Sequence, residues 1–324
     1  MSKWVRAHTN IALIKYWGKE DEEFIIPKNN SLSLTLDAFY TDTRVTFDSS
    51  LKEDQLILDG EEQDASALKK VSTILDIVRN KAELTDYALV ESINYVPTAA
   101  GLASSASGLA ALAGAANEAS ELNLSAQELS RLARRGSGSA SRSIYGGFVE
   151  WEKGINDETS FAHPIDNATW DIGMLFIIVK QAKKDVSSRD GMQRTVTTSP
   201  FYAGWLSTLD QDLTDMKLSI AEQNIDKVGA IAERNALKMH ATTLGAQPPF
   251  TYWTADSMIA MDAVRKLRKE NYSVYFTMDA GPNVKVICKQ SEMDKIKKAL
   301  LAYFDEEQII SAKPGPGIQV LENR

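Results

Sequence analysis

PTAAGLASSASG, residues 97–108, is the most informative stretch of this 324-residue chain. Its side chains are small, and an Ala/Leu-rich segment with helical character follows it to about residue 122. A small-residue loop that opens a helix leaves backbone N–H groups free at the helix start, where the helix dipole also favours anions. Ser104, Ser105 and Ser107 add hydroxyl donors or a Mg²⁺ ligand. The stretch predicts a phosphate-binding loop; the alternative is a tight turn into a closely packed helix.

Other nucleotide-binding and zinc-binding motifs are absent from the sequence. There is no G-x-x-x-x-G-K-[ST], no G-x-G-x-x-G and no G-x-S-x-G. Cys288 is the single cysteine, which excludes an internal disulfide framework and any site built from several thiolates. His8, His163 and His240 lie far apart in the sequence, which excludes zinc chemistry of the H-E-x-x-H type. We expect His8 and His240 to be structural rather than catalytic.

Segments on both sides of the small-residue loop carry basic and hydroxyl groups. Downstream, residues 134–147 read RRGSGSASRSIYGG, a second candidate anion cradle in which the Arg142 guanidinium suits a bidentate grip on carboxylate or phosphate. The alternative there is an ordinary helix end followed by a turn. Upstream, residues 10–19 read NIALIKYWGK and contain Lys15 and Lys19. Charges in such a segment more often form a solvated edge than a site.

Two later segments extend this pattern. Residues 183–192, KKDVSSRDGM, combine basic and hydroxyl groups after a predicted buried strand. Residues 278–284, MDAGPNV, place Asp279 at a strand end before a Gly-Pro turn, where aspartate is ordinarily a turn residue. Four basic or hydroxyl-rich segments in an acidic chain predict a pocket for a small polyanion. Spacing and composition lead no further than a nucleotide-using or polyphosphate-using enzyme.

Composition and charge limit the class of protein. The chain is 44% apolar and 25% charged, the balance of a soluble protein with a core, and its length predicts two domains or one large one. A net charge of −8 argues against a nucleic-acid partner, which needs an extended basic surface. No apolar stretch approaches the roughly 20 residues of a membrane span, and the N-terminus lacks a signal-peptide pattern. We therefore expect a cytoplasmic protein without a membrane partner.

Secondary-structure patterns favour an α+β fold, because strands and helices do not alternate regularly. The second half has the order helix–strand–strand–helix–strand, which resembles half of a ferredoxin-like sandwich. We place a soft domain boundary near residue 180, giving an N-terminal domain of 1–180 and a C-terminal domain of 181–324, with the last strand free to return to the first domain. Strands are expected at 43–48, 87–95, 148–152, 172–180, 273–278, 284–289 and 317–321, and helices at 65–80, 104–122, 125–135, 224–240, 251–269 and 291–304.

Together these segments resemble the mevalonate diphosphate decarboxylases, a family of the GHMP kinase superfamily. Residues 97–108 look like the superfamily's P-x-x-x-G-L-x-S-S phosphate loop. One departure is Ser141, where many relatives carry Cys, and a small side chain is kept. Five stretches resemble the decarboxylases in particular within this superfamily. They occur in the same order as in that family and span almost the whole chain: NIALIKYWGK, GSGSASRSIYGGFVEW, VSSRDGM, NALKMHATTLGAQPPFTYW and FTMDAGPNVK.

The resemblance implies a fold and an activity. The fold is the GHMP kinase fold, in which an N-terminal α/β domain with the phosphate loop packs on a ferredoxin-like C-terminal α+β domain, and the active site lies in the cleft between them. The activity is ATP-dependent conversion of mevalonate 5-diphosphate to isopentenyl diphosphate, phosphate and carbon dioxide, through a 3-phosphorylated intermediate. The family often forms homodimers, so a homodimer is expected.

Two groups of alternatives stay open. Within the superfamily, a mevalonate 3-kinase would stop at the phosphorylated alcohol, and a phosphomevalonate decarboxylase would use the monophosphate. The presence of Lys15, Arg142 and Asp279 together favours decarboxylation over a bare kinase. Outside the superfamily, a non-catalytic nucleotide-binding or RNA-associated module is the rival, and the acidic composition argues against it.

The resemblance also implies roles for single residues. Asp279 would lie beside the 3-hydroxyl as general base or orienting acceptor, with Lys15 next to it. Arg142, helped by Asn10, would grip the substrate carboxylate. Residues expected to hold the diphosphate tail are Tyr16, Lys19, Ser137, Gly138, Ser139, Ser188 and Arg189, with Met192 packing nearby. Residues expected to hold the ATP phosphates and Mg²⁺ are Gly101, Ser104, Ser105 and Ser107, with Ser105 as the metal ligand and Lys184 as a further nucleotide contact.

Overall fold

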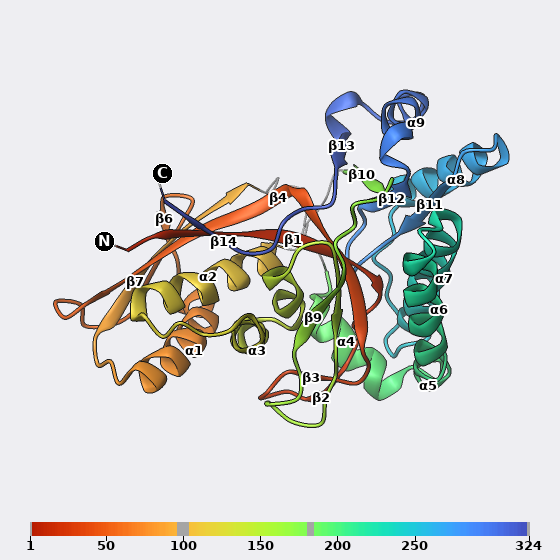
Figure 1. Cartoon of the computed structure of the whole chain (residues 1–324). Coiled ribbons are helices and arrows are strands. Elements are labelled where there is room, and N and C mark those ends of the chain that lie inside the picture. The colour runs from red at the N-terminus through yellow and green to blue at the C-terminus, as the bar shows by residue number, and fades with distance from the viewer. Residues whose placement is uncertain (1, 96–103, 180–184, 323–324) are drawn as a thin grey trace.

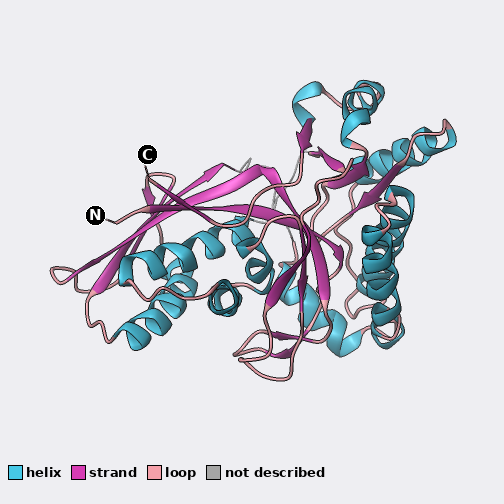
Figure 2. Cartoon of the chain, in the orientation of Figure 1, coloured by secondary structure: helices cyan, strands magenta, loops and turns pink. Residues whose placement is uncertain are grey.

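Two main β-sheets, each with helices packed against it, make up the structure. The computed structural model describes residues 2–95, 104–179 and 185–322. Figure 1 and Figure 2 show the larger sheet beside the N-terminal helices and the smaller sheet beside the C-terminal ones. Most of the predicted phosphate loop, residues 97–103, lies outside the described residues. The predicted α+β class is confirmed.

The larger sheet has eight strands and is built around two long ones. β1 (Trp4–Ile14) and β4 (Ser31–Asp48) run antiparallel. The strand order is β14-β1-β4-β7-β5-β6, and β8 pairs with both β4 and β9. A separate hairpin joins β2 (Lys19–Asp21) to β3 (Ile26–Pro27). The other strands of the large sheet are β5 (Gln55–Leu58), β6 (Glu61–Glu62), β7 (Tyr87–Tyr95), β8 (Phe148–Trp151), β9 (Ala162–Asp166) and β14 (Gln319–Leu321).

Three helices cover one face of the large sheet (Figure 1). They are α1 (Ala65–Ala82), α2 (Ser104–Ser120) and α3 (Ala126–Gly136). The predicted capping box is present, since the Ser125 hydroxyl accepts from the Glu128 N–H and the Glu128 carboxylate accepts from the Ser125 N–H. A Cβ at Gly114 would meet Ile318 Cδ1 at 2.3 Å. The small residues of α2 therefore let this helix lie close to the sheet.

The smaller sheet has the order β11-β12-β10-β13. Both faces of β10 are buried, which explains its continuous apolar sequence. One face packs toward α6 and α7, and the other packs toward α8 and α9. The strands are β10 (Gly173–Ile177), β11 (Val274–Thr277), β12 (Val284–Cys288) and β13 (Ile309–Ala312). The helices are α4 (Ser188–Thr198), α5 (Tyr202–Leu206), α6 (Leu209–Ala221), α7 (Ile225–Leu244), α8 (Ala255–Lys269) and α9 (Met293–Leu300), with short 3-10 turns η2 (Gly138–Ile144), η3 (Gln290–Glu292) and η4 (Glu306–Gln308).

The long strand β1 joins the two halves through the core. Near its start, Val5 packs with α1, α2 and α3, whereas Leu13 near its end packs with β10, α6 and α7. Sequence patterns do not predict this strand, because residues 7–11 are buried without a break and show no alternation. The segment that follows β1 consequently enters the region between the two sheets.

The ends of the smaller sheet differ from the expected order of strands. The strand that follows α9 in this sheet is β13, which the sequence patterns do not predict. The predicted last strand is β14, and it pairs with β1 in the large sheet, Trp4 lying opposite Leu321. The division of the chain at residue 180 stays a prediction. None of the helices within the described residues is both long and apolar enough to cross a membrane.

Candidate active site

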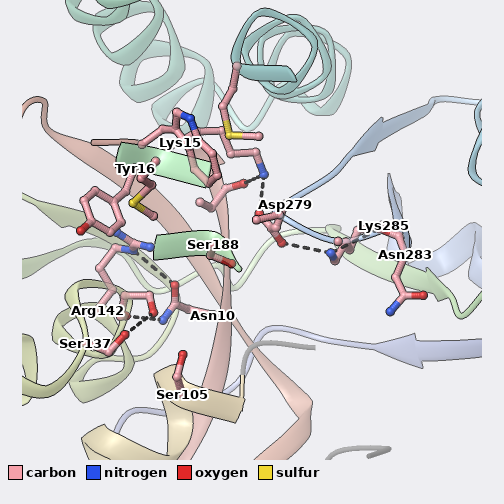
Figure 3. A pocket seen from close by; sticks show the side chains of 17 residues that line it. Asn10, Lys15, Tyr16, Ser105, Ser137, Arg142, Ser188, Asp279, Asn283 and Lys285 are labelled. Atoms are coloured by element: carbon pink, nitrogen blue, oxygen red, sulfur yellow. Dashed lines mark hydrogen bonds and ion pairs between the residues drawn. The ribbon is translucent and has the colours of Figure 1, made fainter. Parts of the chain in front are cut away.

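A cavity of about 400 Å³ lies where the two halves meet (Figure 3). Its walls come from the end of β1, from η2, from the first turns of α2 and α4, and from the loop between β11 and β12. Segments far apart in the sequence therefore share one space. The lining residues are Asn10, Ala12, Lys15, Tyr16, Trp17, Ser105, Ser137, Ser139, Arg142, Ser188, Met192, Met239, Asp279, Ala280, Gly281, Asn283 and Lys285.

At one corner of the cavity a carboxylate is held between two lysines. Lys15 Nζ donates to Asp279 Oδ1 at 2.7 Å, and Lys285 Nζ lies 3.0 Å from Oδ2. Lys15 Nζ also donates to the carbonyl of Ala12 at 2.7 Å. The Asp279 side chain is 34% exposed, whereas those of Lys15 and Lys285 are 2% and 5% exposed. The carboxylate is thus the part of this triad that remains open to the cavity.

Proton affinities at this corner follow from burial and charge. Burial alone would raise the pKa of Asp279, but the charges and hydrogen bonds of Lys15 and Lys285 outweigh it and hold that pKa well below its usual range. Burial lowers the pKa of Lys15 to about 8, although the Asp279 carboxylate opposes the change. Asp279 is therefore ionised at neutral pH, and Lys15, with a pKa of about 8, is the one of the two whose charge changes just above neutral pH.

The backbone of Lys15 is fixed from both sides. Its N–H donates to Asn235 Oδ1 at 2.9 Å, and its carbonyl accepts from Asn29 Nδ2 at 2.9 Å. Asn235 in turn donates to the buried Asp212 carboxylate at 2.9 Å. The ammonium at the end of β1 consequently has little freedom before any ligand arrives.

At another corner of the cavity a guanidinium is buried among neutral groups. Arg142 Nε donates to Asn10 Oδ1 at 3.2 Å and to Ser33 Oγ at 3.0 Å, and Nη1 donates to Ser31 Oγ at 2.6 Å. Among the described residues no carboxylate lies within ion-pair distance of it. Burial lowers the pKa of Arg142 to about 10, which keeps it charged at neutral pH. Asn10 is oriented by donating to the Ser139 carbonyl at 2.9 Å.

The cavity as a whole has an excess of positive charge. Three cationic side chains line it, and one carboxylate does. A net excess of two positive charges, carried by buried side chains, is costly without a counter-charge. An anionic ligand is the natural complement to these walls.

Hydroxyl groups line the remaining wall of the cavity. Ser137 Oγ and Ser139 Oγ lie 3.2 Å apart at the start of η2. Ser188 begins α4 and Ser105 lies in the first turn of α2, so the positive ends of two helices meet the cavity. Burial raises the pKa of Tyr16, which keeps its phenol protonated as a donor. Hydroxyl donors and helix starts of this kind suit phosphate oxygens.

Most of the residues that the sequence indicates are brought together here. Two of the others have partners of their own: Lys19 pairs with Glu22, and the buried Ser107 Oγ lies 2.8 Å from Thr41 Oγ1. Arg189 is exposed on α4. Gly101, Lys184 and the side chain of Ser104 lie outside the described residues. The indicated residues that line the cavity are Asn10, Lys15, Tyr16, Ser105, Ser137, Ser139, Arg142, Ser188, Met192 and Asp279.

Gly138 has a packing reason for being glycine. A Cβ there would lie 2.6 Å from Trp151 Cη2 and 3.0 Å from Tyr16 Cε1. The Tyr16 and Trp151 rings meet edge to face at 4.8 Å, and the Arg142 guanidinium lies 5.8 Å from the Trp151 ring. The expected contact of Gly138 with the substrate stays a prediction.

Sequence reasoning misses several lining residues, and Lys285 is the most important of them. The others carry no charge that marks them as site residues, although they lie in the stretches that carry the resemblance: Ala12, Trp17, Met239, Ala280, Gly281 and Asn283. Lys285 does carry a signal, because it is the one charged residue of the buried strand VKVIC. A lysine at such a position requires a partner.

Two family models match the chain. One is the diphosphomevalonate decarboxylase-like N-terminal domain, over residues 7–162, and the other is the mevalonate 5-diphosphate decarboxylase C-terminal domain, over residues 174–318. The chain belongs to the diphosphomevalonate decarboxylase family.

Relatives and solved structures agree with this family. The diphosphomevalonate decarboxylase of Candida albicans is 33% identical over 317 residues, which cover 93% of this chain and 88% of that protein. The structure of MDDEF in complex with MVAPP, AMPPCP and magnesium is 57% identical, covers 99% of both chains and has a TM-score of 0.95. The mevalonate diphosphate decarboxylase of Staphylococcus aureus is 52% identical, with 99% of this chain and 98% of that chain covered and a TM-score of 0.96. The predicted resemblance and the GHMP kinase fold are confirmed.

Proposed function

We propose that the chain catalyses the ATP-dependent decarboxylation of mevalonate 5-diphosphate. The products are isopentenyl diphosphate, ADP, phosphate and carbon dioxide, within the mevalonate pathway of isoprenoid and lipid metabolism. The arrangement of charge in the cavity carries the proposal: Asp279 is held by two lysines, and Arg142, which has no carboxylate at ion-pair distance among the described residues, lies in the same space. This arrangement suits a substrate with one reacting hydroxyl and several anionic groups. The similar protein MDDEF has been solved with MVAPP.

The first step transfers the γ-phosphoryl group of ATP to the 3-hydroxyl. In a loose transition state, positioning and charge stabilisation matter more than strong base catalysis. The low pKa of Asp279 makes it an acceptor that orients the hydroxyl and takes its proton late, once the new P–O bond has made that oxygen acidic. Lys15, 2.7 Å from this carboxylate, offsets the charge of the transferring group.

The second step breaks two bonds at the substrate. The 3-phosphate leaves the tertiary carbon with its bonding electrons, and the bond to the carboxylate then breaks so that its electron pair forms the new double bond. A tertiary alcohol is a poor leaving group and its phosphate is a good one, which explains the need for ATP. Arg142 and Asn10 hold the carboxylate in the orientation required for loss of carbon dioxide.

The diphosphate tail has a set of donors on one wall. Tyr16 supplies a protonated phenol, and Ser188 lies at the start of a helix. Lys19 exchanges Glu22 for the substrate when the tail binds. The full set proposed for the tail is Tyr16, Lys19, Ser137, Gly138, Ser139, Ser188 and Arg189, with Met192 packing beside it.

ATP and Mg²⁺ are assigned to the region around the start of α2. Ser105 is exposed at the cavity, and its hydroxyl is a suitable oxygen ligand for Mg²⁺. Among the described residues no three His, Cys, Asp or Glu side chains gather into a metal site, so the nucleotide phosphates would supply the other ligands. The bound ion would neutralise phosphate charge. The proposed nucleotide contacts are Gly101, Ser104, Ser105, Ser107 and Lys184.

A homodimer in the cytoplasm is part of the proposal. The homodimer rests on the resemblance to a family whose members often form homodimers. The cytoplasmic location rests on the single cysteine, which is buried and gives the chain no internal disulfide.

One experiment separates the proposed reaction from its nearest rivals. The purified protein is incubated with ATP, Mg²⁺ and, in turn, mevalonate, mevalonate 5-phosphate and mevalonate 5-diphosphate. Released carbon dioxide and the mass of the product are measured. We expect carbon dioxide and isopentenyl diphosphate from the diphosphate alone. A phosphorylated mevalonate without carbon dioxide would instead identify a kinase, and turnover of the monophosphate would identify a phosphomevalonate decarboxylase.

A further inference from the structure

Lys285 reaches Asp279 from the opposite side to Lys15. It lies on β12, every residue of which is buried, and it is the one charged residue of that strand. Its ammonium lies 3.0 Å from Asp279 Oδ2 and donates to the Asn283 carbonyl at 3.3 Å. Within the described part of the chain, Asp279 is the one carboxylate at ion-pair distance from it. A buried ammonium with a single counter-charge is costly to keep, so a functional reason is expected.

The position of Lys285 is tied to that of Asp279 by a hairpin. β11 and β12 pair antiparallel, with Thr277 opposite Lys285, and Asp279 lies in the loop that connects the two strands. This loop is anchored where the Ser257 hydroxyl donates to the Pro282 carbonyl at 2.7 Å. Lys285 therefore holds Asp279 from within its own hairpin, whereas Lys15 arrives from the other sheet (Figure 3).

The two lysines are held with different strength. Lys15 Nζ makes two contacts of 2.7 Å, to Asp279 and to the Ala12 carbonyl. Lys285 makes contacts of 3.0 and 3.3 Å. Lys15 therefore makes the closer contacts of the two lysines.

We propose that Lys285 is a positioning residue that fixes the Asp279 carboxylate from its own hairpin and adds a second positive charge beside the transferring phosphoryl group. This inference rests on the proposed function. It gives Lys285, on β12, a role beside Asp279 of the kind that the family resemblance implies for Lys15, which follows β1.

The charge of Lys285 has a consequence for both of its neighbours. The charged or titratable groups that face Asp279 are Lys15 from β1, Arg142 from η2, His240 from α7 and Lys285 itself. Removing one positive charge raises the pKa of Asp279 and also that of Lys15, since Lys285 lowers both. The protonated form of Lys15 then persists to higher pH.

The test compares Lys285→Met with the wild type and with Lys295→Met, an exposed lysine on α9. We expect kcat to fall about 10- to 100-fold, as for loss of a charged hydrogen bond, while KM for the substrate changes less than about threefold. The alkaline fall of kcat/KM moves to higher pH. A kcat within threefold of wild type, or a lower kcat with an unmoved alkaline fall, would overturn the inference. Thermal melting checks folding, and Lys285→Gln replaces the Met variant if that variant is unfolded.

A second measurement needs no turnover. The Nζ signal of Lys15 is titrated by NMR in ¹⁵N-lysine-labelled, ligand-free protein, with Lys15→Arg to assign it. In Lys285→Met we expect titration at higher pH than in the wild type, and an unchanged titration counts against Lys285. If the titration moves while the wild type releases no carbon dioxide from mevalonate 5-diphosphate, the proposed function fails and the charge coupling stands.

Discussion

Two corners of the cavity differ in whether the protein itself balances the charge there. At one corner Asp279 is paired with Lys15 and Lys285, so the protein itself supplies both signs of charge. At the other corner Arg142 is surrounded by neutral oxygens. The first corner is complete before a ligand arrives and suits a neutral hydroxyl, whereas the second gains its counter-charge from the ligand. The contrast separates the place where phosphoryl transfer is prepared from the place where the carboxylate is held.

Replacing Asp279 by Asn breaks the paired corner and has the largest expected effect. The amide keeps the shape but loses the charge that orients the hydroxyl between two ammonium groups, so kcat should fall by roughly 10²- to 10⁴-fold. Steady-state formation of isopentenyl diphosphate measures it, with the exposed Asp294→Asn as the matched control. A rate within tenfold of wild type would contradict the assigned role.

Replacing Arg142 by Lys tests the unpaired corner. The charge is kept, but the planar fork that grips a carboxylate is lost. We expect release of carbon dioxide to fall about 10- to 150-fold, the equivalent of roughly 1.5–3 kcal/mol for a charged hydrogen bond. Arg265→Lys, at an exposed position on α8, is the control. Near-normal release of carbon dioxide from the Arg142 variant would remove the carboxylate assignment.

The two corners should also lose their positive charge at different pH values. Lys15 carries its charge below a pKa of about 8 and loses it above, whereas Arg142 stays charged to a pKa of about 10. In the wild type kcat/KM should therefore decline above about pH 8, approaching tenfold per pH unit well beyond it. Rates measured from pH 6 to 10 check this, and Lys15→Met should abolish the decline together with most of the activity. A profile that stays level to pH 9.5 would show that another group governs the alkaline side.

The smallest expected effect is a loss of stability from replacing Gly138, which packs against Trp151 beside Arg142. In Gly138→Ala the new methyl group meets Trp151 at 2.6 Å, and overpacking of this kind costs about 1–3 kcal/mol of unfolding free energy. Gly108→Ala is the matched control, because it adds a methyl group in α2 with nothing within 4 Å and should stabilise by up to about 1 kcal/mol. Denaturant unfolding of both variants decides the point. Equal stability of the two would contradict the packing role of Gly138.

The sequence locates the cavity well because its polar residues lie in distinctive local stretches. Arg142 and Asp279 come from segments rich in small or polar residues, Asn10 and Lys15 come from the stretch NIALIKYWGK, and all four line one space. The family resemblance supplies their roles, which composition alone does not. Helix ends with side-chain caps, such as Ser125, are equally readable.

The features that the sequence does not predict depend on pairing between strands far apart in the chain. Residues 7–11 of β1 are buried on both faces of the sheet, so the period of two that marks a strand is lost over the middle of it. Lys285 becomes meaningful once the register of β11 and β12 places it beside Asp279. The choice between β13 and β14 for the edge of the smaller sheet depends on which partner strand is free, and no local pattern encodes that.

The pairing of β14 with β1 has a consequence for how the protein is made. Trp4 and Leu321 lie opposite one another at the edge of the large sheet, so β1 leaves the ribosome long before its partner β14 does. All the strands and helices between these two strands must be synthesised before that edge is covered, and β1 keeps an open side until then. A nascent chain that stalls before β14 emerges carries an exposed strand edge, which makes it prone to aggregation at that stage.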